Sequence, residues 1–128
     1  MSSANETFEI GRKLVELCNQ GRNLEAIEQL YAPTIVSIET HGSPEMPARM
    51  QGIDAIRQKN QWWFQNHTIH SGQVQGPWPH GDRFIVTMKY EITPKAGPMA
   101  GQRMTVEEAG LYTVRDGKIV QEEFFYHM

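Results

Sequence analysis

The sequence has little of what several large classes of protein require. Its 128 residues include one cysteine, Cys18, which cannot form a disulfide within the chain or supply a multi-cysteine zinc site. No apolar run reaches the roughly 18 residues that a membrane span needs, and residues 1–6 lack a signal-peptide core. Twelve Lys and Arg stand against 15 Asp and Glu, so the basic excess typical of nucleic-acid binders is absent. We therefore expect a soluble, cytoplasmic protein that binds neither membranes nor nucleic acid.

The chain also lacks the short motifs that mark several kinds of enzyme. It has no glycine-rich phosphate loop, no serine-centred nucleophile elbow and no nucleotide fingerprint. Five histidines are present, and His67 and His70 straddle an expected helix–strand junction, but no His-Glu-x-x-His pattern or other standard ligand spacing occurs. We therefore expect no bound metal and no cofactor.

The composition fits one folded domain. Hydrophobic residues make up 39% and charged residues 21%, values typical of a folded protein and not of a disordered tail. A chain of 128 residues is near the common size for a single core, and no low-complexity linker or internal repeat divides it. We expect one domain over residues 1–128.

Apolar periodicity predicts two helices before residue 34. Ser3 and Glu6 have the spacing of a capping box, and Gly21 is a natural stop for the first helix. A shorter helix follows from Asn23 and closes near Pro33. The expected apolar faces consist of Ile10, Leu14, Leu17 and Cys18 in the first helix and of Leu24, Ile27, Leu30 and Tyr31 in the second.

The next segment predicts a strand, a loop and a third helix. Residues 34–40 are β-branched and short, as is typical of a strand. Residues 41–51 contain a glycine and two prolines, which predicts an irregular loop. Gly52 then opens a longer helix, with Asp54 favourably placed near its positive end. One side of this helix is expected to carry Ile53, Ile56, Asn60, Trp63 and His67.

The rest of the chain predicts β-structure. Residues 70–78 form an expected strand that is broken at Gly76-Pro77, and residues 84–93 alternate between two kinds of side chain, as in a half-buried strand. Residues 102–114 and 118–127 are expected to pair as a hairpin. Helices gathered on one face of an antiparallel sheet make an α+β domain.

Two features, beside this order of elements, carry a resemblance to known proteins. They are the Tyr31-Ala32 step before the first strand and the Asp116-Gly117-Lys118-Ile119 turn near the end. Together they resemble the nuclear transport factor 2-like superfamily, which includes ketosteroid isomerases, SnoaL-like polyketide cyclases and limonene epoxide hydrolases. The segments KNQWWFQNHTIH (residues 59–70) and EEFFY (residues 122–126) look most like SnoaL-like members.

The resemblance implies an architecture and an assembly. In this superfamily three N-terminal helices pack on a curved, mostly antiparallel sheet, forming a cone-shaped α+β barrel whose open end holds a small, mostly apolar ligand. A homodimer through the convex sheet face is also implied. Ile85, Leu111 and Phe125 would supply the apolar patch that such an interface needs.

The register of the last hairpin decides which side chains face the cone. A two-residue turn would pair Val114 with Ile119 and aim Glu123 inward, whereas a three-residue loop with a bulge would pair Val114 with Lys118 and aim Glu122 inward. The residues alone leave both registers open, and the family resemblance favours the three-residue loop. That register places Val120, Glu122, Phe124 and Tyr126 inside.

Three glutamates are candidates for catalysis. The even-numbered positions of residues 104–114 are the more apolar ones, and Glu108 shares their side. With Glu122 also inside, two neighbouring buried carboxyls would offer an acid and a base. Glu39, eight residues after Tyr31, resembles in position the catalytic base of ketosteroid isomerases. The alternative for all three is a solvated place at the surface of the sheet.

The oxyanion-binding groups of the ketosteroid isomerases do not carry over. Their tyrosine falls near Leu14 or Val15 and their protonated aspartate near Gly110, so steroid isomerisation is not expected. Polar and aromatic side chains still supply candidate contacts to a small ligand. The expected ligand-binding residues are Asn60, Trp63, Tyr90, Tyr112, Phe124 and Tyr126.

Two functions follow from these features. The first is a cofactor-free isomerase, cyclase or hydratase for a small, largely apolar carbonyl compound, with Glu39 as general base and Glu108, Glu122 and Asn60 as acid or orienting groups. The second is a non-catalytic ligand-binding or dimerisation module. Convergence of the three glutamates on one apolar cavity would favour catalysis, and exposure to solvent would favour the module.

Overall fold

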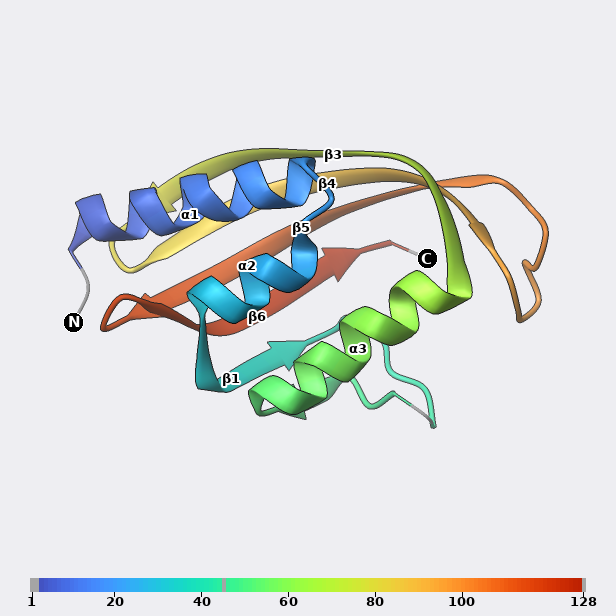
Figure 1. The fold of residues 1–128 in the computed structure, drawn as a ribbon, viewed down its shortest axis with the longest axis horizontal. Coiled ribbons are helices and arrows are strands. Elements are labelled where there is room, and N and C mark those ends of the chain that lie inside the picture. Colours follow the sequence, from blue (N-terminus) through green and yellow to red (C-terminus); the bar gives the residue numbers. More distant parts are fainter. Residues whose placement is uncertain (1–2, 45, 128) are drawn as a thin grey trace.

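The structure is a computed structural model that describes residues 3–44 and 46–127. Over these residues, helices pack on one face of a six-stranded sheet, which confirms the expected α+β fold (Figure 1), and none of the helices is long and apolar enough to cross a membrane. Along the chain the elements are α1 (Ala4–Asn19), α2 (Asn23–Leu30), β1 (Tyr31–Ile38), β2 (Arg49–Gln51), α3 (Ile53–Asn66), β3 (His67–His80), β4 (Arg83–Pro94), β5 (Met104–Arg115) and β6 (Lys118–Tyr126).

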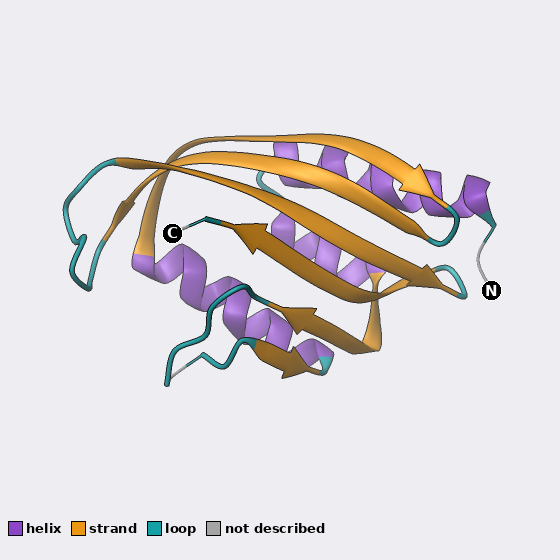
Figure 2. Ribbon diagram, turned by 180° about the vertical axis from the view of Figure 1, so that it is seen from behind, coloured by secondary structure: helices purple, strands orange, loops and turns teal. Residues whose placement is uncertain are grey.

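The sheet is curved and open. Its strand order is β2-β1-β6-β5-β4-β3, with β1 and β6 parallel and the other neighbouring pairs antiparallel. The helices all lie against one face, and Figure 2 shows the opposite face with its strands in front. Because β2 and β3 are free edges, the cone is a wrapped sheet and not a closed barrel.

Capping and periodicity account for the helices. The hydroxyl of Ser3 accepts a hydrogen bond from the Glu6 N–H at 3.1 Å, so α1 is capped where the sequence predicted. The prediction that Leu24 lies on the buried face of α2 is wrong. Leu24 is 53% exposed, because the buried face of this short helix runs through Ala26 and Leu30.

The segment before α3 contains a strand that the sequence did not predict. β2 lies within the expected loop of residues 41–51 and pairs antiparallel with β1, Ile38 opposite Arg49. The Glu39 N–H continues this pairing by donating to the Ala48 carbonyl at 2.8 Å. Three residues are too few for alternation to show in a sequence. The pairing ties the start of the loop to the end of β1, where Glu39 lies.

The turn between β5 and β6 corrects the expected register. Asp116 and Gly117 both have positive φ, 51° and 77°, and form a two-residue turn. Val114 pairs with Ile119 and not with Lys118, so the expected three-residue loop is wrong. An Asp-Gly pair can adopt these left-handed conformations, which suit the tight turn.

A bulge in β6 brings Glu122 to the inner face despite this turn. Thr113 pairs with Gln121 and the next pair along skips Val120, which is therefore an extra residue. Val120, expected inside, lies instead beside Thr113 in a shallow depression of the outer face. Glu122 is opposite Tyr112 and faces the core, as expected.

Strands β4 and β5 follow the predicted alternation. Their even-numbered residues face the helices and their odd-numbered residues face outward. The fully or largely buried members of this inner face are Phe84, Val86, Met88, Ile92, Tyr112 and Val114.

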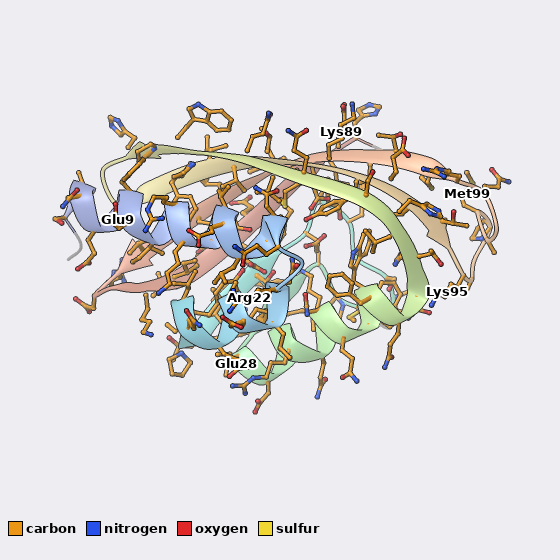
Figure 3. All side chains as sticks on the ribbon, turned by 45° about the horizontal axis from the view of Figure 1, so that its top comes forward. Glu9, Arg22, Glu28, Lys89, Lys95 and Met99 are labelled. Carbon is orange, nitrogen blue, oxygen red and sulfur yellow. The ribbon has the colours of Figure 1, made fainter. Side chains whose placement is uncertain are left out.

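Ion pairs cover the outward faces of the helices. Arg57 of α3 bonds to Glu28 of α2 at 2.6 Å, and Arg12 bonds to Glu9 within α1 at 3.1 Å. Figure 3 shows Glu9 and Glu28 at the surface of their helices. Exposed pairs contribute about 0–1 kcal/mol each, so the apolar core carries most of the stability.

The amide of Asn19 covers part of the free edge of β3. Its NH2 group donates to the Val74 carbonyl at 2.9 Å, and its oxygen accepts from the Val74 N–H at 2.8 Å. A further strand would make the same pair of bonds with an edge residue. Asn19 thus joins the end of α1 to the sheet.

We predict that Asn19→Ala lowers the free energy of unfolding by about 1 kcal/mol, because both backbone groups of Val74 lose their protein partner. Urea denaturation measures the loss, and hydrogen exchange of the Val74 amide should become faster. Gln20→Ala, at the exposed next position, is the control. Unchanged exchange at Val74 would contradict this role of Asn19.

No helix covers the outer face of the sheet (Figure 2), and this face carries exposed apolar side chains. Ile85 lies between Leu111 on β5 and Trp78 on β3 in the strand register. Ile85 is 43% exposed and Phe125 is 48% exposed. These residues form the patch that the expected dimer would bury.

We propose that two copies of the chain associate through this face, and we predict that Ile85→Lys converts the dimer into a monomer because it places a charge in the patch. Sedimentation equilibrium at micromolar concentration measures the mass. Met99→Lys, in the exposed connection between β4 and β5, is the control (Figure 3). A wild-type chain that sediments only as a monomer would overturn the proposal.

Candidate active site

A cavity of about 380 Å³ lies between the helices and the inner face of the sheet. Its lining comes from α1, α2 and α3, from the inner sides of β4, β5 and β6, and from the loop after β1. Most lining side chains are aliphatic, aromatic or methionine, with a smaller number of polar groups. A cavity of this size and composition suits a small, mostly apolar molecule.

The cavity brings together nearly all of the site residues predicted from sequence. Glu39, Glu108 and Glu122 all line it, so the three glutamates converge. Tyr126 is the exception. It is not part of the lining, because its ring turns toward His41 and its hydroxyl donates to Glu39 Oε1 at 3.1 Å. The predicted ligand contacts that do line the cavity are Asn60, Trp63, Tyr90, Tyr112 and Phe124.

Glu122 is buried, with both carboxylate oxygens hydrogen-bonded. It is 4% exposed, the Tyr31 hydroxyl donates to Oε1, and the Ser37 hydroxyl donates to Oε2 at 2.6 Å. Burial raises the pKa of Glu122, while Lys59 and the two hydroxyl donors oppose the rise. Both donors come from β1, which pairs with β6 in parallel register.

Lys59 links this buried carboxylate to Glu39. Its Nζ donates to Ser37 Oγ at 2.8 Å and to Glu39 Oε2 at 2.5 Å. The side chains of Lys59 and Glu39 are only 20% and 23% exposed, so solvent screens this ion pair less than a surface pair. A continuous chain of hydrogen bonds therefore runs through Tyr31, Glu122, Ser37, Lys59, Glu39 and Tyr126.

Glu108 lies outside this chain of hydrogen bonds. It projects from the inner face of β5 opposite Met88, and its carboxyl has no hydrogen-bond partner among the described residues. Burial raises the pKa of Glu108 to about 7, the charge of Glu39 adds to the rise, and Lys59 opposes it. Glu108 is therefore a carboxyl that can hold or release a proton near neutral pH.

Stacked aromatic rings form the sheet side of the cavity. Tyr112 stacks on Phe84 with ring centroids 5.0 Å apart and meets Phe124 edge-on at 6.1 Å. Gly110 allows this arrangement, since a Cβ at this position would lie 2.8 Å from the Tyr112 ring. The burial of the Tyr112 hydroxyl raises its pKa well above the ordinary value. This wall is therefore apolar and neutral.

The cysteine and the histidines do not form a reactive centre. Burial raises the pKa of Cys18 to about 12, so the thiol stays protonated. His67 stacks on Trp63 at 3.9 Å at the end of α3. Within residues 3–44 and 46–127 no group of three or more His, Cys, Asp or Glu is placed to hold a metal ion.

Sequence reasoning missed Lys59 and Ser37. Ser37 is fully buried on the inner side of β1, and nothing in a β-branched segment distinguishes such a serine from a structural one. Lys59 did leave a signal. It falls between Ile56 and Asn60 on the apolar side of the helix, where a charged residue needs a buried partner.

Comparison with protein families identifies this architecture. The family model of the SnoaL-like domain matches residues 5–126. The chain belongs to the SnoaL-like family. A comparison with curated proteins finds no significant match.

Solved structures share the fold of this SnoaL-like domain. A candidate SnoaL-like polyketide cyclase from Mesorhizobium loti, whose name also includes carbohydrate phosphatase, is 45% identical, with a TM-score of 0.85 over 92% of this chain and 97% of that one. A nuclear transport factor 2-like protein from Burkholderia thailandensis is 20% identical, with a TM-score of 0.79 over 99% and 92% of the two chains. A candidate isomerase from Bacillus subtilis is 16% identical, with a TM-score of 0.74 over 99% and 90%. The last two are similar in fold alone.

We predict that Glu108→Gln stabilises the protein at about pH 8 and not at about pH 4. The folded pKa of about 7 lies above the ordinary value of 4.5, so the unfolded chain loses this proton first and wild-type stability falls as pH rises between the two values. The gain of the variant at high pH is at most about 3 kcal/mol. Thermal unfolding across this pH range measures it.

The matched control is Glu107→Gln, whose side chain is 71% exposed on the opposite face of β5. Its stability relative to the wild type should change little with pH. A difference between Glu108→Gln and the wild type that stays constant from acid to alkaline pH would contradict the burial of an uncompensated carboxyl.

Proposed function

We propose that this SnoaL-like domain is a cofactor-free isomerase, cyclase or hydratase that uses a carboxylate general base on a small, largely apolar carbonyl compound. The observation that carries the proposal is the Glu108 carboxyl, which has a pKa of about 7 and lines an apolar cavity. A group whose pKa lies near the working pH is an effective general acid or base, because both of its forms are available. Removal of a proton next to a carbonyl needs such a group.

Glu108 suits the role of general base better than Glu39. Both oxygens of Glu39 are engaged, one by Lys59 at 2.5 Å and one by Tyr126 at 3.1 Å. Protonation of Glu39 would weaken its ion pair with Lys59, whereas Glu108 has no such partner among the described residues. In this proposal Glu39 holds Lys59 in place, and Glu122 holds Ser37.

The predicted ligand contacts suit a ligand whose apolar part lies beside the Glu108 carboxyl. The rings of Trp63, Tyr112 and Phe124 line the cavity. Asn60 also lines it, and its amide has no hydrogen-bond partner among the described residues. Asn60 is only partly buried, and its amide is available to orient a polar atom of the ligand.

Convergence of the glutamates supports catalysis over a non-catalytic ligand-binding or dimerisation module. A binding pocket for an apolar ligand gains nothing from three carboxyls whose burial costs free energy. The names of two similar proteins, a candidate polyketide cyclase and a candidate isomerase, are consistent with proton transfer at carbon. A phosphate ester would instead bring negative charge toward Glu39, Glu108 and Glu122.

Exchange of a carbon-bound proton tests the proposal without knowledge of the natural substrate. With cyclohexanone or acetophenone in D2O, we expect the protein to speed the exchange of hydrogen for deuterium at the carbon next to the carbonyl. Proton NMR measures the rate of this exchange. Glu108→Gln should slow the protein-catalysed exchange by a factor of about 10²–10⁴. The wild-type rate should rise with pH and level off above about 7, because the base acts in its deprotonated form.

Two further variants sharpen this test. Glu107→Gln, on the exposed side of β5, should catalyse ketone exchange at the wild-type rate. A larger loss in Glu39→Gln than in Glu108→Gln would return the base role to Glu39. Binding of both ketones without any exchange would favour the non-catalytic module.

A further inference from the structure

The ammonium group of Lys59 has one hydrogen-bond donor that the described residues do not use. An ammonium carries three donors. Nζ donates to Ser37 Oγ and to Glu39 Oε2, and no third acceptor occurs within residues 3–44 and 46–127. Nζ also lies 5.1 Å from the centre of the Phe124 ring, which lines the same cavity. The remaining N–H is available to an oxygen atom of a bound molecule.

The direction of this donor is fixed from two sides. Ser37 can accept from Lys59 because its own proton goes to Glu122, so the serine oxygen presents a lone pair to Nζ. Glu39 holds the other side and is itself held by the Tyr126 hydroxyl. Fixing a lysine side chain costs rotamer entropy, and here that ordering precedes ligand binding.

Charge balance favours an oxygen that becomes negative only during the reaction. A ligand that arrives as an anion meets the carboxylates of Glu39, Glu108 and Glu122 against the single cation of Lys59. A neutral carbonyl compound avoids that repulsion. When Glu108 accepts a proton it loses its negative charge, and the charge that forms on the carbonyl oxygen replaces it without changing the total. The unused N–H of Lys59 therefore stabilises the transition state more than the bound ketone, because the negative charge develops on the oxygen that it contacts.

We propose that Lys59 is a catalytic residue that binds the carbonyl oxygen of an enolisable ketone and stabilises the enolate. This assignment rests on the proposed proton transfer by Glu108. The Glu108 carboxylate takes a proton from the carbon next to the carbonyl, the C–H electron pair forms a carbon–carbon double bond, and the carbonyl π pair moves to the oxygen beside Lys59. Return of the proton from Glu108 to a carbon of the enolate restores the carbonyl, and no oxidant or reductant is consumed.

Ser37 is a positioning residue in this scheme. It does not meet the ligand, since it is fully buried and does not line the cavity. It sets the direction of the Lys59 ammonium and connects it to the buried Glu122. Its loss should therefore weaken oxygen binding at Lys59 without changing the apolar walls.

Binding of para-nitrophenol tests the assignment separately from turnover. The phenol enters neutral, ionises near neutral pH, and its phenolate resembles an enolate and absorbs visible light. At a pH below 7, where Glu108 is protonated as it is in the enolate complex, we expect the wild-type protein to bind the phenolate about tenfold or more tightly than the neutral phenol, and Lys59→Met to lose this preference. Nitrobenzene, which lacks the ionisable hydroxyl group, should bind both proteins with affinities within about twofold.

Control variants keep the test decisive. Lys59→Arg retains a cationic donor and should recover part of the preference, and Lys95→Met, at the surface in Figure 3, should behave as wild type. If Lys59→Met does not fold, Ser37→Ala serves in its place and should lower the preference about threefold or more. Equal binding of phenol and phenolate by the wild type, or a preference that survives in Lys59→Met or Ser37→Ala, would overturn the assignment.

The outcomes for Lys59 and for Glu108 are distinguishable. Glu108→Gln keeps the ammonium and should keep the phenolate preference while it loses ketone exchange. A wild-type protein that prefers phenolate but catalyses no exchange would refute the proposed proton transfer and leave oxygen binding by Lys59 in place. Exchange without any phenolate preference would refute the role of Lys59 alone.

Discussion

The arrangement of the site depends on how one buried carboxyl group, that of Glu122, is satisfied. An isolated carboxylate in an apolar interior costs many kcal/mol, and hydrogen bonds to both oxygens lower that cost. Tyr31 and Ser37 provide them, and the parallel register of β1 and β6 aligns Ser37 with Glu122 directly. Because the serine gives its proton to Glu122, its oxygen is left to accept from Lys59. Through Ser37, the buried carboxyl of Glu122 therefore helps to position the ammonium group of Lys59 on α3.

The inward direction of Glu122 in turn depends on one extra residue. A two-residue turn without a bulge would have placed Glu123 inside, because side chains alternate along a strand. The bulge at Val120 shifts the alternation by one residue. The sequence predicted the correct inner carboxylate through an incorrect loop, since residues 119–126 do not alternate and nothing local reveals the bulge. Contact of β6 with both β5 and β1 selects it, and such long-range contacts are not visible in a single segment.

The features predicted correctly are those with a local cause. The Ser3 cap, the alternation of β4 and the inner position of Glu108 follow from spacing within a few residues. Lys59 and Ser37 escaped because their importance comes from partners 20 residues or more away in the chain. A polar residue on an apolar face shows that a partner must exist. It does not show which one.

The difference between Glu39 and Glu108 follows from the position of the same ammonium group. Both carboxyls line one cavity. Lys59 contacts Glu39 directly, at 2.5 Å, and acts on Glu108 only through space, where burial outweighs it. One carboxyl is therefore paired with a cation, while the other exchanges a proton near neutral pH. An acid–base group and a fixed cation with an unused donor thus come to lie in one apolar cavity, although the two belong to different elements, β5 and α3. The asymmetry depends on where Lys59 is anchored, and its two hydrogen-bond partners, Ser37 and Glu39, set that position.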